Sequence, residues 1–205
     1  MATQEAKYLR FPVIKEYLEN TFKPEDEDED FNPLQSPCDT IFQKILDCYF
    51  TIEDDFMTET QGYPDSGQDR TKYNIAVKTL AHDQLETVLI VEAKRFPRRT
   101  STWKNVTEKC WTNPKKQLQE YMRKANDNGE WGHTMYGIVM LGDHVHFLQR
   151  GSTSDTLKAY ESEVLSRAQK STLSIRDDDV LLEEVLLEIL EKVKRDRQRR
   201  RGLRP

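Results

Sequence analysis

The chain of 205 residues has little cysteine and no long apolar segment. Cys38, Cys48 and Cys110 are an odd number without Cys-x-x-Cys spacing, which argues against a disulfide framework and a structural zinc site. No apolar run approaches the roughly 20 residues needed to cross a bilayer, and the N-terminus has no uninterrupted apolar signal segment. The sequence therefore predicts an intracellular protein, cytoplasmic or nuclear, with free thiols and no membrane partner.

Several motifs of well-known enzyme classes are also missing. The chain has no Ser or Cys nucleophile motif, no Gly-rich phosphate loop and no dinucleotide-binding fingerprint. Its net charge of −5 does not indicate a general nucleic-acid binder, because phosphate binding requires clustered Lys and Arg. The 36% hydrophobic and 33% charged residues are typical of one globular domain with a polar surface.

The spacing of apolar residues predicts alternating helices and strands. Pro12 opens a short helix that ends near Asn20, and an acidic loop follows. Further helices are predicted over 39–50, 114–125 and 177–194, and strands over 56–60, 73–80, 87–93, 135–141 and 144–149. Asp39 is the expected N-cap of one helix, and Pro114 is expected in the first turn of another. We expect three parts: an N-terminal helix and acidic loop (1–38), an α/β core (39–150), and a C-terminal helix with a basic tail (151–205).

The predicted strand over 87–93 is apolar on both faces, which is typical of a central strand covered on both sides. It ends in Glu92-Ala93-Lys94. Glu92 and Lys94 are two residues apart, so both side chains should leave the same face, together with Val88 and Ile90. A carboxylate and an ammonium at the end of a buried strand are costly unless they have a function. A divalent cation bound through Glu92, with Lys94 positioning a water molecule, would be such a function.

The preceding strand should lie beside this motif. A hairpin turn at about 81–86 would bring residues 73–75 next to residues 92–94. A metal site across the two strands needs an acidic residue near position 74, but the chain has Asn74 there. An Asn carbonyl oxygen can bind Mg²⁺ but contributes no negative charge. The acids that could supply the charge instead are Asp69, Asp65 and Glu59.

These motifs resemble the PD-(D/E)XK nuclease superfamily, whose members have an acid early in the second strand and (Asp/Glu)-x-Lys at the end of the third. Pro64-Asp65 followed by Glu92-Ala93-Lys94 satisfies the literal pattern. Gln117 and Tyr121, four residues apart on the next helix, resemble the Gln-x-x-x-Tyr element of the RecB-type branch. The strand, Gly turn and strand over 135–149 look like the end of nuclease-like domains common in filamentous fungi. The resemblance covers about residues 39–150.

The resemblance implies a restriction-endonuclease-like α/β fold, in which a mixed central sheet is flanked by helices. It also implies an Mg²⁺- or Mn²⁺-dependent nuclease that hydrolyses nucleic-acid phosphodiesters. The metal ligands would be Glu92, Asp69, Asp65 and, as a neutral ligand, Asn74. Lys94 would orient the attacking water, and Gln117 would brace the site or contact the substrate. The substrate-binding residues would be Arg95, Arg98, Arg99 and Tyr121.

Two alternatives remain open at this point. The chain could be a catalytically degenerate nuclease-fold protein that acts as an interaction module, or it could be an enzyme that reuses the pocket for a small molecule. A homodimer through the C-terminal helix would use the apolar stripe Leu182, Val185, Leu186, Ile189, Leu190 and Val193, although the stripe could equally pack on the domain. The basic segment 192–204 could contact nucleic acid or act as a nuclear-localisation signal, or it could be a frayed, solvated helix end.

Overall fold

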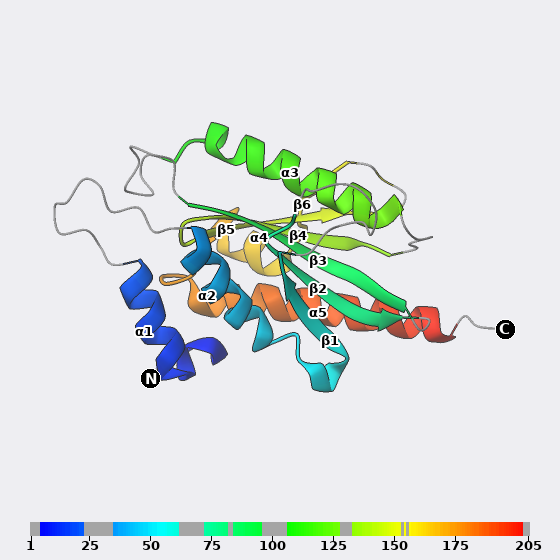
Figure 1. Ribbon diagram of the computed structural model, residues 1–205, viewed down its shortest axis with the longest axis horizontal. Helices are drawn as coiled ribbons and strands as arrows, with labels where there is room; N and C mark the ends of the chain where they lie inside the picture. Colours follow the sequence, from blue (N-terminus) through cyan, green and yellow to red (C-terminus); the bar gives the residue numbers. More distant parts are fainter. Residues whose placement is uncertain are drawn as a thin grey trace.

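The computed structural model describes residues 5–22, 35–61, 72–81, 84–95, 106–127, 133–152, 154 and 156–202. Within these residues, a central sheet of seven strands is covered by helices on both faces (Figure 1). Helix α3 covers one face, and helices α2, α4 and α5 cover the other. The predicted α/β class with a mixed central sheet flanked by helices is confirmed at this level.

Along the chain, two groups of three consecutive strands (β1–β3 and β4–β6) are separated by the long helix α3. The helices are α1 (Pro12–Thr21), α2 (Gln35–Asp47), α3 (Glu108–Asp127), α4 (Glu163–Ala168) and α5 (Asp179–Gly202), with 3₁₀ turns η1 (Lys7–Arg10) and η2 (Ile52–Asp54). The strands are β1 (Phe56–Thr60), β2 (Ile75–Ala81), β3 (Gln84–Lys94), β4 (Met135–Leu141), β5 (His144–Arg150), β6 (Lys158–Ala159) and β7 (Thr172–Ser174). None of the described helices is both long and apolar enough to span a membrane.

The sheet has the order β1-β2-β3-β4-β5-β6, and β7 also pairs with β5. Strands β3 and β4 are parallel, and the other neighbouring strands are antiparallel. Helix α3 makes the crossover between the two parallel strands, as such a connection requires. Strand β3 is therefore central, as its apolar sequence predicted, and its buried end lies where three strands and two helical layers meet.

A register shift between β2 and β3 changes one detail of the predicted faces. The shift lies between Val77 and Lys78, opposite Val88. As a result, Val88 packs in the same cluster as Leu89, on the face covered by α2 and α5. Ile90 packs under α3 instead. The prediction that Val88 shares the face of Glu92 and Lys94 was therefore wrong for Val88, because a bulge interrupts the alternation of a strand.

The C-terminal helix is part of the domain core. The apolar residues of its stripe are all buried in the larger core cluster: Leu182, Val185, Leu186, Ile189, Leu190 and Val193. Only Leu187, at its margin, is a substantially exposed large apolar residue of α5. The surface on which the homodimer hypothesis was based is therefore already covered by the same chain.

The basic end of α5 is folded against the sheet. Lys194 Nζ lies 3.0 Å from Asp54 Oδ2, and Arg200 Nη1 lies 2.6 Å from Glu86 Oε2. Arg197 donates to the Thr79 hydroxyl at 3.1 Å. These contacts show that the helix end is neither frayed nor fully solvated over the described residues, because its cations neutralise acids at the start of the sheet.

Two helix starts differ from the prediction. Helix α2 begins at Gln35, so Asp39 lies inside the helix and is not its N-cap. Helix α3 begins at Glu108, which makes Pro114 an interior residue. Proline lacks an N–H, so one backbone hydrogen bond is lost at Pro114, which is buried in the helix. The short elements α4, β6 and β7 were not predicted, because six, two and three residues are too few to show a period.

Candidate functional site

Glu92 is the most unusual residue of the sheet. It lies on β3, and its side chain is only 1% exposed. Neither carboxylate oxygen has a hydrogen-bond partner. Buried carboxylates normally have their oxygens satisfied, because the loss of water is costly for a charged group. The orphaned oxygens of Glu92 therefore indicate a group that binds something other than the protein.

Lys94 approaches Glu92 from the same strand face, as the sequence predicted. Its Nζ lies 2.5 Å from Glu92 Oε1, and its side chain is 33% exposed. Lys94 therefore faces Oε1 as an ion-pair partner, and Oε2 has no hydrogen-bond partner. Burial raises the pKa of Glu92, and the ammonium of Lys94 opposes that rise. Lys94 thus links the buried carboxylate to the solvent side of the site.

Asn74 lies next to β3, where the predicted hairpin placed it. Its Oδ1 accepts a hydrogen bond from the backbone N–H of Ala93 at 2.9 Å. Its Nδ2 donates to Asp39 Oδ2 at 3.2 Å. Because Oδ1 already binds a backbone N–H and the amide nitrogen points toward a carboxylate, this geometry does not support Asn74 as a neutral metal ligand. The amide is a bridge between the strand pair and helix α2.

Asp39 is the acidic residue that the sequence analysis did not find. It lies on α2, 35 residues before Asn74, and its Oδ1 is buried without a hydrogen-bond partner. Burial raises its pKa to about 6, and the charge of Glu92 adds to the rise, whereas Asn74 and Lys94 oppose it. Asp39 is linked to the end of β3 through Asn74, which bonds both the Asp39 carboxylate and the backbone of Ala93, next to Glu92. Asp39 is therefore a second acidic side chain near the end of β3, beside the predicted Glu92.

The signal for Asp39 in the sequence was weak but present. The residue was selected as an N-cap, a role in which Asp is common. Once the helix is extended back to Gln35, Asp39 loses that explanation and becomes an acid on a half-buried helix surface. Only the packing of α2 against the sheet brings it to Asn74, and no local pattern encodes that contact.

Helix α3 brings Tyr121 to the site but not Gln117. Tyr121 is 4% exposed, and its pKa is raised to about 12 by burial and then by the charge of Glu92. Gln117 is exposed, and no hydrogen bond links its side chain to Glu92 or Lys94. Gln117 and Tyr121 therefore do not share one environment, because Tyr121 is buried against the sheet and Gln117 is exposed.

The other predicted residues are placed as follows. Asp65, Asp69, Arg98 and Arg99 lie outside the described residues. Arg95 directly follows β3 and is half-buried. Glu59, on β1, forms an ion pair with Lys78 and accepts a hydrogen bond from the Tyr73 hydroxyl at 3.1 Å. Glu59 is therefore committed to its own strand pair and is not a ligand for the site of Glu92.

The donor set of this site matches a small hard cation. Asp39 and Glu92 provide three buried oxygens without hydrogen-bond partners, of which Glu92 Oε1 forms an ion pair with Lys94. In the part of the chain that the structure describes, no group of three or more His, Cys, Asp or Glu side chains could hold a metal ion. Mg²⁺ is usually held by one or two carboxylates and keeps several waters, so two carboxylates suffice for it. The residues present thus fit Mg²⁺ or Mn²⁺ better than a transition metal that requires several His or Cys ligands.

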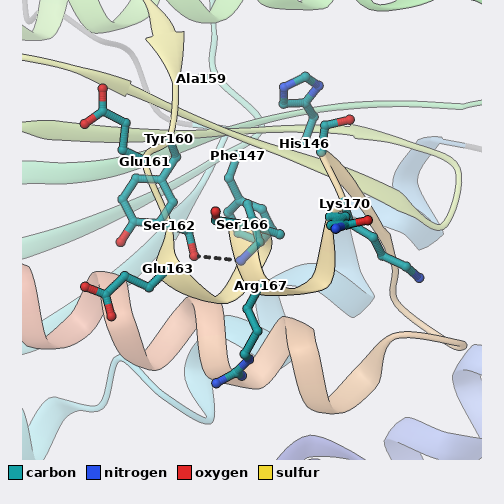
Figure 2. A pocket seen from close by; sticks show the side chains of 13 residues that line it. His146, Phe147, Ala159, Tyr160, Glu161, Ser162, Glu163, Ser166, Arg167 and Lys170 are labelled. Atoms are coloured by element: carbon teal, nitrogen blue, oxygen red, sulfur yellow. Dashed lines mark hydrogen bonds between the residues drawn. The ribbon is translucent and has the colours of Figure 1, made fainter.

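Two cavities of the described residues lie away from these carboxylates. A groove of ≈ 910 Å³ runs between β5, β6 and α4, where His146, Tyr160, Ser162 and Arg167 are among its lining residues (Figure 2). A second cavity of ≈ 390 Å³ lies between the end of α2 and β1. Neither is lined by Asp39, Asn74, Glu92 or Lys94. Cavity size therefore does not identify the carboxylate site, whereas its orphaned oxygens do.

Comparisons of the chain with models of protein families, with curated proteins and with solved structures found no match.

Proposed function

We propose that the protein is a PD-(D/E)XK-like nuclease that uses Mg²⁺ or Mn²⁺ to hydrolyse nucleic-acid phosphodiesters. The observation that carries the proposal is that Asp39 and Glu92, which Asn74 links, have three buried oxygens without hydrogen-bond partners beside the Lys94 ammonium. A divalent cation is the simplest partner for two such carboxylates, because it would neutralise both charges and accept all three oxygens.

The arrangement of the strands supports the same proposal. The superfamily pattern requires its acidic and (Asp/Glu)-x-Lys motifs on neighbouring second and third strands. Here Asn74 directly precedes β2, and Glu92 and Lys94 end β3, which pairs with it. The acid expected at position 74 is replaced by Asp39 from the helix that precedes the sheet. The departure at Asn74 therefore no longer leaves the site with one carboxylate.

Each residue has a defined chemical task in this proposal. Asp39 and Glu92 hold the ion, which when bound supplies Lewis-acid stabilisation of the charge that develops on the phosphate. The Lys94 ammonium, which is partly exposed, holds the attacking water and neutralises developing negative charge. Tyr121 closes the apolar side of the site under α3. Arg95, Arg98 and Arg99 follow the motif in sequence and supply cations for the nucleic-acid backbone.

The alternatives have less support. An interaction module that dimerises through α5 would need an apolar surface that the core already uses. A charged residue at Leu186 would therefore unfold the domain and would not test a dimer, because Leu186 is fully buried. A small-molecule enzyme would be favoured by a closed cavity around Glu92, and neither described cavity includes that residue. A cytoplasmic or nuclear location stays a prediction.

The proposal is tested by Mn²⁺ calorimetry with a plasmid-cleavage assay on the wild type and two matched variants. Glu92→Gln removes the buried charge at the end of β3, and Glu86→Gln removes a charge at the start of the same strand. We expect Glu92→Gln to weaken Mn²⁺ binding at least about 100-fold and to abolish cleavage, because a metal site loses one of two charged ligands.

Glu86→Gln should leave Mn²⁺ binding and cleavage close to those of the wild type, because Glu86 is engaged by Arg200. If the wild type binds no Mn²⁺ at millimolar concentration, or if both variants bind it equally well, the nuclease proposal is wrong. The buried carboxylates would then need another explanation.

A further inference from the structure

Asn74 is held more firmly than any other polar residue of the candidate site. Its backbone C=O accepts from the N–H of Gln61 at 2.9 Å, which ties it to the end of β1. Its side-chain Oδ1 accepts from the N–H of Ala93 at 2.9 Å, which ties it to β3. The residue is therefore anchored to strands on both sides through its backbone C=O and its side-chain oxygen, and its amide nitrogen remains available to contact Asp39.

The chemistry of these partners fixes the orientation of the amide. The N–H of Ala93 can only donate, so it must face the carbonyl oxygen of Asn74. The Nδ2 group then faces Asp39 Oδ2, which can only accept when the carboxylate is ionised. A flipped amide would place two donors together at Ala93 and two acceptors together at Asp39. The orientation is thus set by the network around it.

One consequence concerns Asp39. Its Oδ2 is pinned to the strand pair through Asn74, whereas its Oδ1 stays buried and unsatisfied. The hydrogen bond crosses from the sheet to helix α2 and restricts the rotation of the carboxylate. An acid at position 74 could still accept from Ala93, but it would present a second acceptor to Asp39. Asparagine is therefore the residue that fits between these two partners.

We propose that Asn74 is a positioning residue, which holds the Asp39 carboxylate of α2 at the site, and that it is not itself a ligand of the ion. This inference rests on the proposed function, because it assumes that Asp39 binds a cation. In this inference, Asp39 on α2 is the charged ligand, and Asn74 beside β2 is its neutral support. Partners that orient a metal ligand in this way typically change the affinity 10- to 100-fold when they are removed.

The first test measures Mn²⁺ affinity by calorimetry at pH 7.5 for the wild type, Asn74→Ala and Asn74→Asp. We expect Asn74→Ala to bind roughly 10- to 100-fold more weakly, because Asp39 loses its support. Asn74→Asp should also bind at least about tenfold more weakly, since two acceptors then face each other. Tighter binding by Asn74→Asp would overturn the inference, because it would show that position 74 reaches the ion directly.

The second test needs no metal. In EDTA, we expect Asn74→Asp to lower the melting temperature by about 4 °C or more, because the hydrogen bond to Asp39 is replaced by repulsion. The exchanged pair Asp39→Asn with Asn74→Asp restores a donor opposite an acceptor, and it should regain most of that loss. A pair as unstable as Asn74→Asp alone would overturn the inference.

The two tests separate the two proposals. If the exchanged pair regains its stability but the wild type binds no Mn²⁺, the nuclease function fails while Asn74 still positions Asp39. If the wild type binds Mn²⁺ and Asn74→Ala binds it equally well, the metal site stands and the positioning role fails.

Discussion

The two ends of β3 each carry a glutamate, and their surroundings differ completely. At the start of the strand, Arg200 Nη1 lies 2.6 Å from Glu86 Oε2, and His133 Nδ1 lies 3.9 Å from the same oxygen. At the other end, Glu92 is more deeply buried, and neither of its oxygens has a hydrogen-bond partner. The first carboxylate is paired with an arginine from the distant end of α5, whereas the second is paired only with Lys94 of its own strand and is almost fully buried.

This difference separates a structural charge from a functional one. A paired, part-buried ion pair joins two elements, and breaking it leaves an uncompensated charge. A buried carboxylate with unsatisfied oxygens destabilises the fold that contains it, and such groups concentrate at functional sites. The comparison therefore predicts opposite effects of the same substitution at the two ends of the strand.

The largest effect is expected at Asp39, which shares the open end of the strand. Asp39→Asn should weaken Mn²⁺ binding about 100-fold and abolish cleavage, because only Glu92 then carries a ligand charge. The matched control is Asp47→Asn on the same helix, whose carboxylate is engaged by Thr58 and Lys44. Calorimetry should show affinity close to wild type for the control. Equal losses in both variants would remove Asp39 from the site.

Lys94 sharpens the comparison because its ammonium pairs with Glu92 and is itself partly exposed. Lys94→Ala should lower the cleavage rate roughly 100-fold, since the group that orients water and neutralises charge is lost. Mn²⁺ affinity at pH 8 should stay within about fivefold of the wild type, because Lys94 donates no metal ligand. Single-turnover cleavage and calorimetry on the same preparation would check both values. A parallel loss of binding and cleavage would contradict this division of roles.

Acidification should weaken Mn²⁺ binding at the end of β3 where Glu92 and Lys94 lie. The pKa of Asp39 is raised to about 6, first by burial and then by the charge of Glu92. Below pH 6 a proton therefore competes with the cation, and Mn²⁺ affinity should fall by up to about tenfold per pH unit. Calorimetry between pH 5 and pH 8 measures this slope. An affinity that is constant across this range would mean that Asp39 does not bind the ion.

The same raised pKa has a consequence for stability without metal. Because the folded protein holds the proton of Asp39 more tightly than the unfolded chain, stability should decrease as the pH rises from about 4 to about 6. The contribution of Asp39 is isolated by subtracting the pH profile of Asp39→Asn in EDTA. A difference profile that rises with pH over this window would contradict the assignment.

The smallest expected effect is on the melting temperature in EDTA. Glu86→Gln should destabilise the fold by about 1–3 kcal/mol, or several degrees, because Arg200 loses its partner at a site only 16–17% exposed. Glu92→Gln should leave the melting temperature unchanged or raise it, because a buried charge with unsatisfied oxygens becomes neutral. Thermal unfolding of the two variants side by side is the measurement. A larger loss for Glu92→Gln would reverse the distinction between the two ends.

Local patterns predicted a large part of this structure. The strand over 56–60 coincides with β1, and the strands over 135–141 and 144–149 agree with β4 and β5 within one residue. Alternation and strand-end composition also placed Glu92 and Lys94 on one face, with Asn74 beside them. These features depend on neighbours in sequence and on a single hairpin, so the chain encodes them locally.

The features that the sequence did not predict all depend on distant contacts. Asp39 joins the site only through the packing of α2, and Gln117 and Tyr121 differ in burial because the sheet covers one side of α3. The basic segment 192–204 was interpreted as a nucleic-acid contact, a nuclear-localisation signal or a frayed helix end, but Lys194 and Arg200 pair with Asp54 and Glu86. The periodic spacing of apolar residues along the sequence does not encode these long-range contacts.

The sequence by itself determined the alternation of strands and helices, the central position of β3 and the (Glu92)-x-(Lys94) motif at its end, because the period of apolar residues sets which faces are buried. Tertiary structure alone decided which charges were matched. It brought the cations of α5 to the start of β3, and it brought Asp39 of α2, through Asn74, to the end of β3 where Glu92 lies, leaving three of their oxygens without hydrogen-bond partners. The physical reason is that whether a charged group is paired depends on the groups near it in space. In this chain, many of those groups lie far away in the sequence.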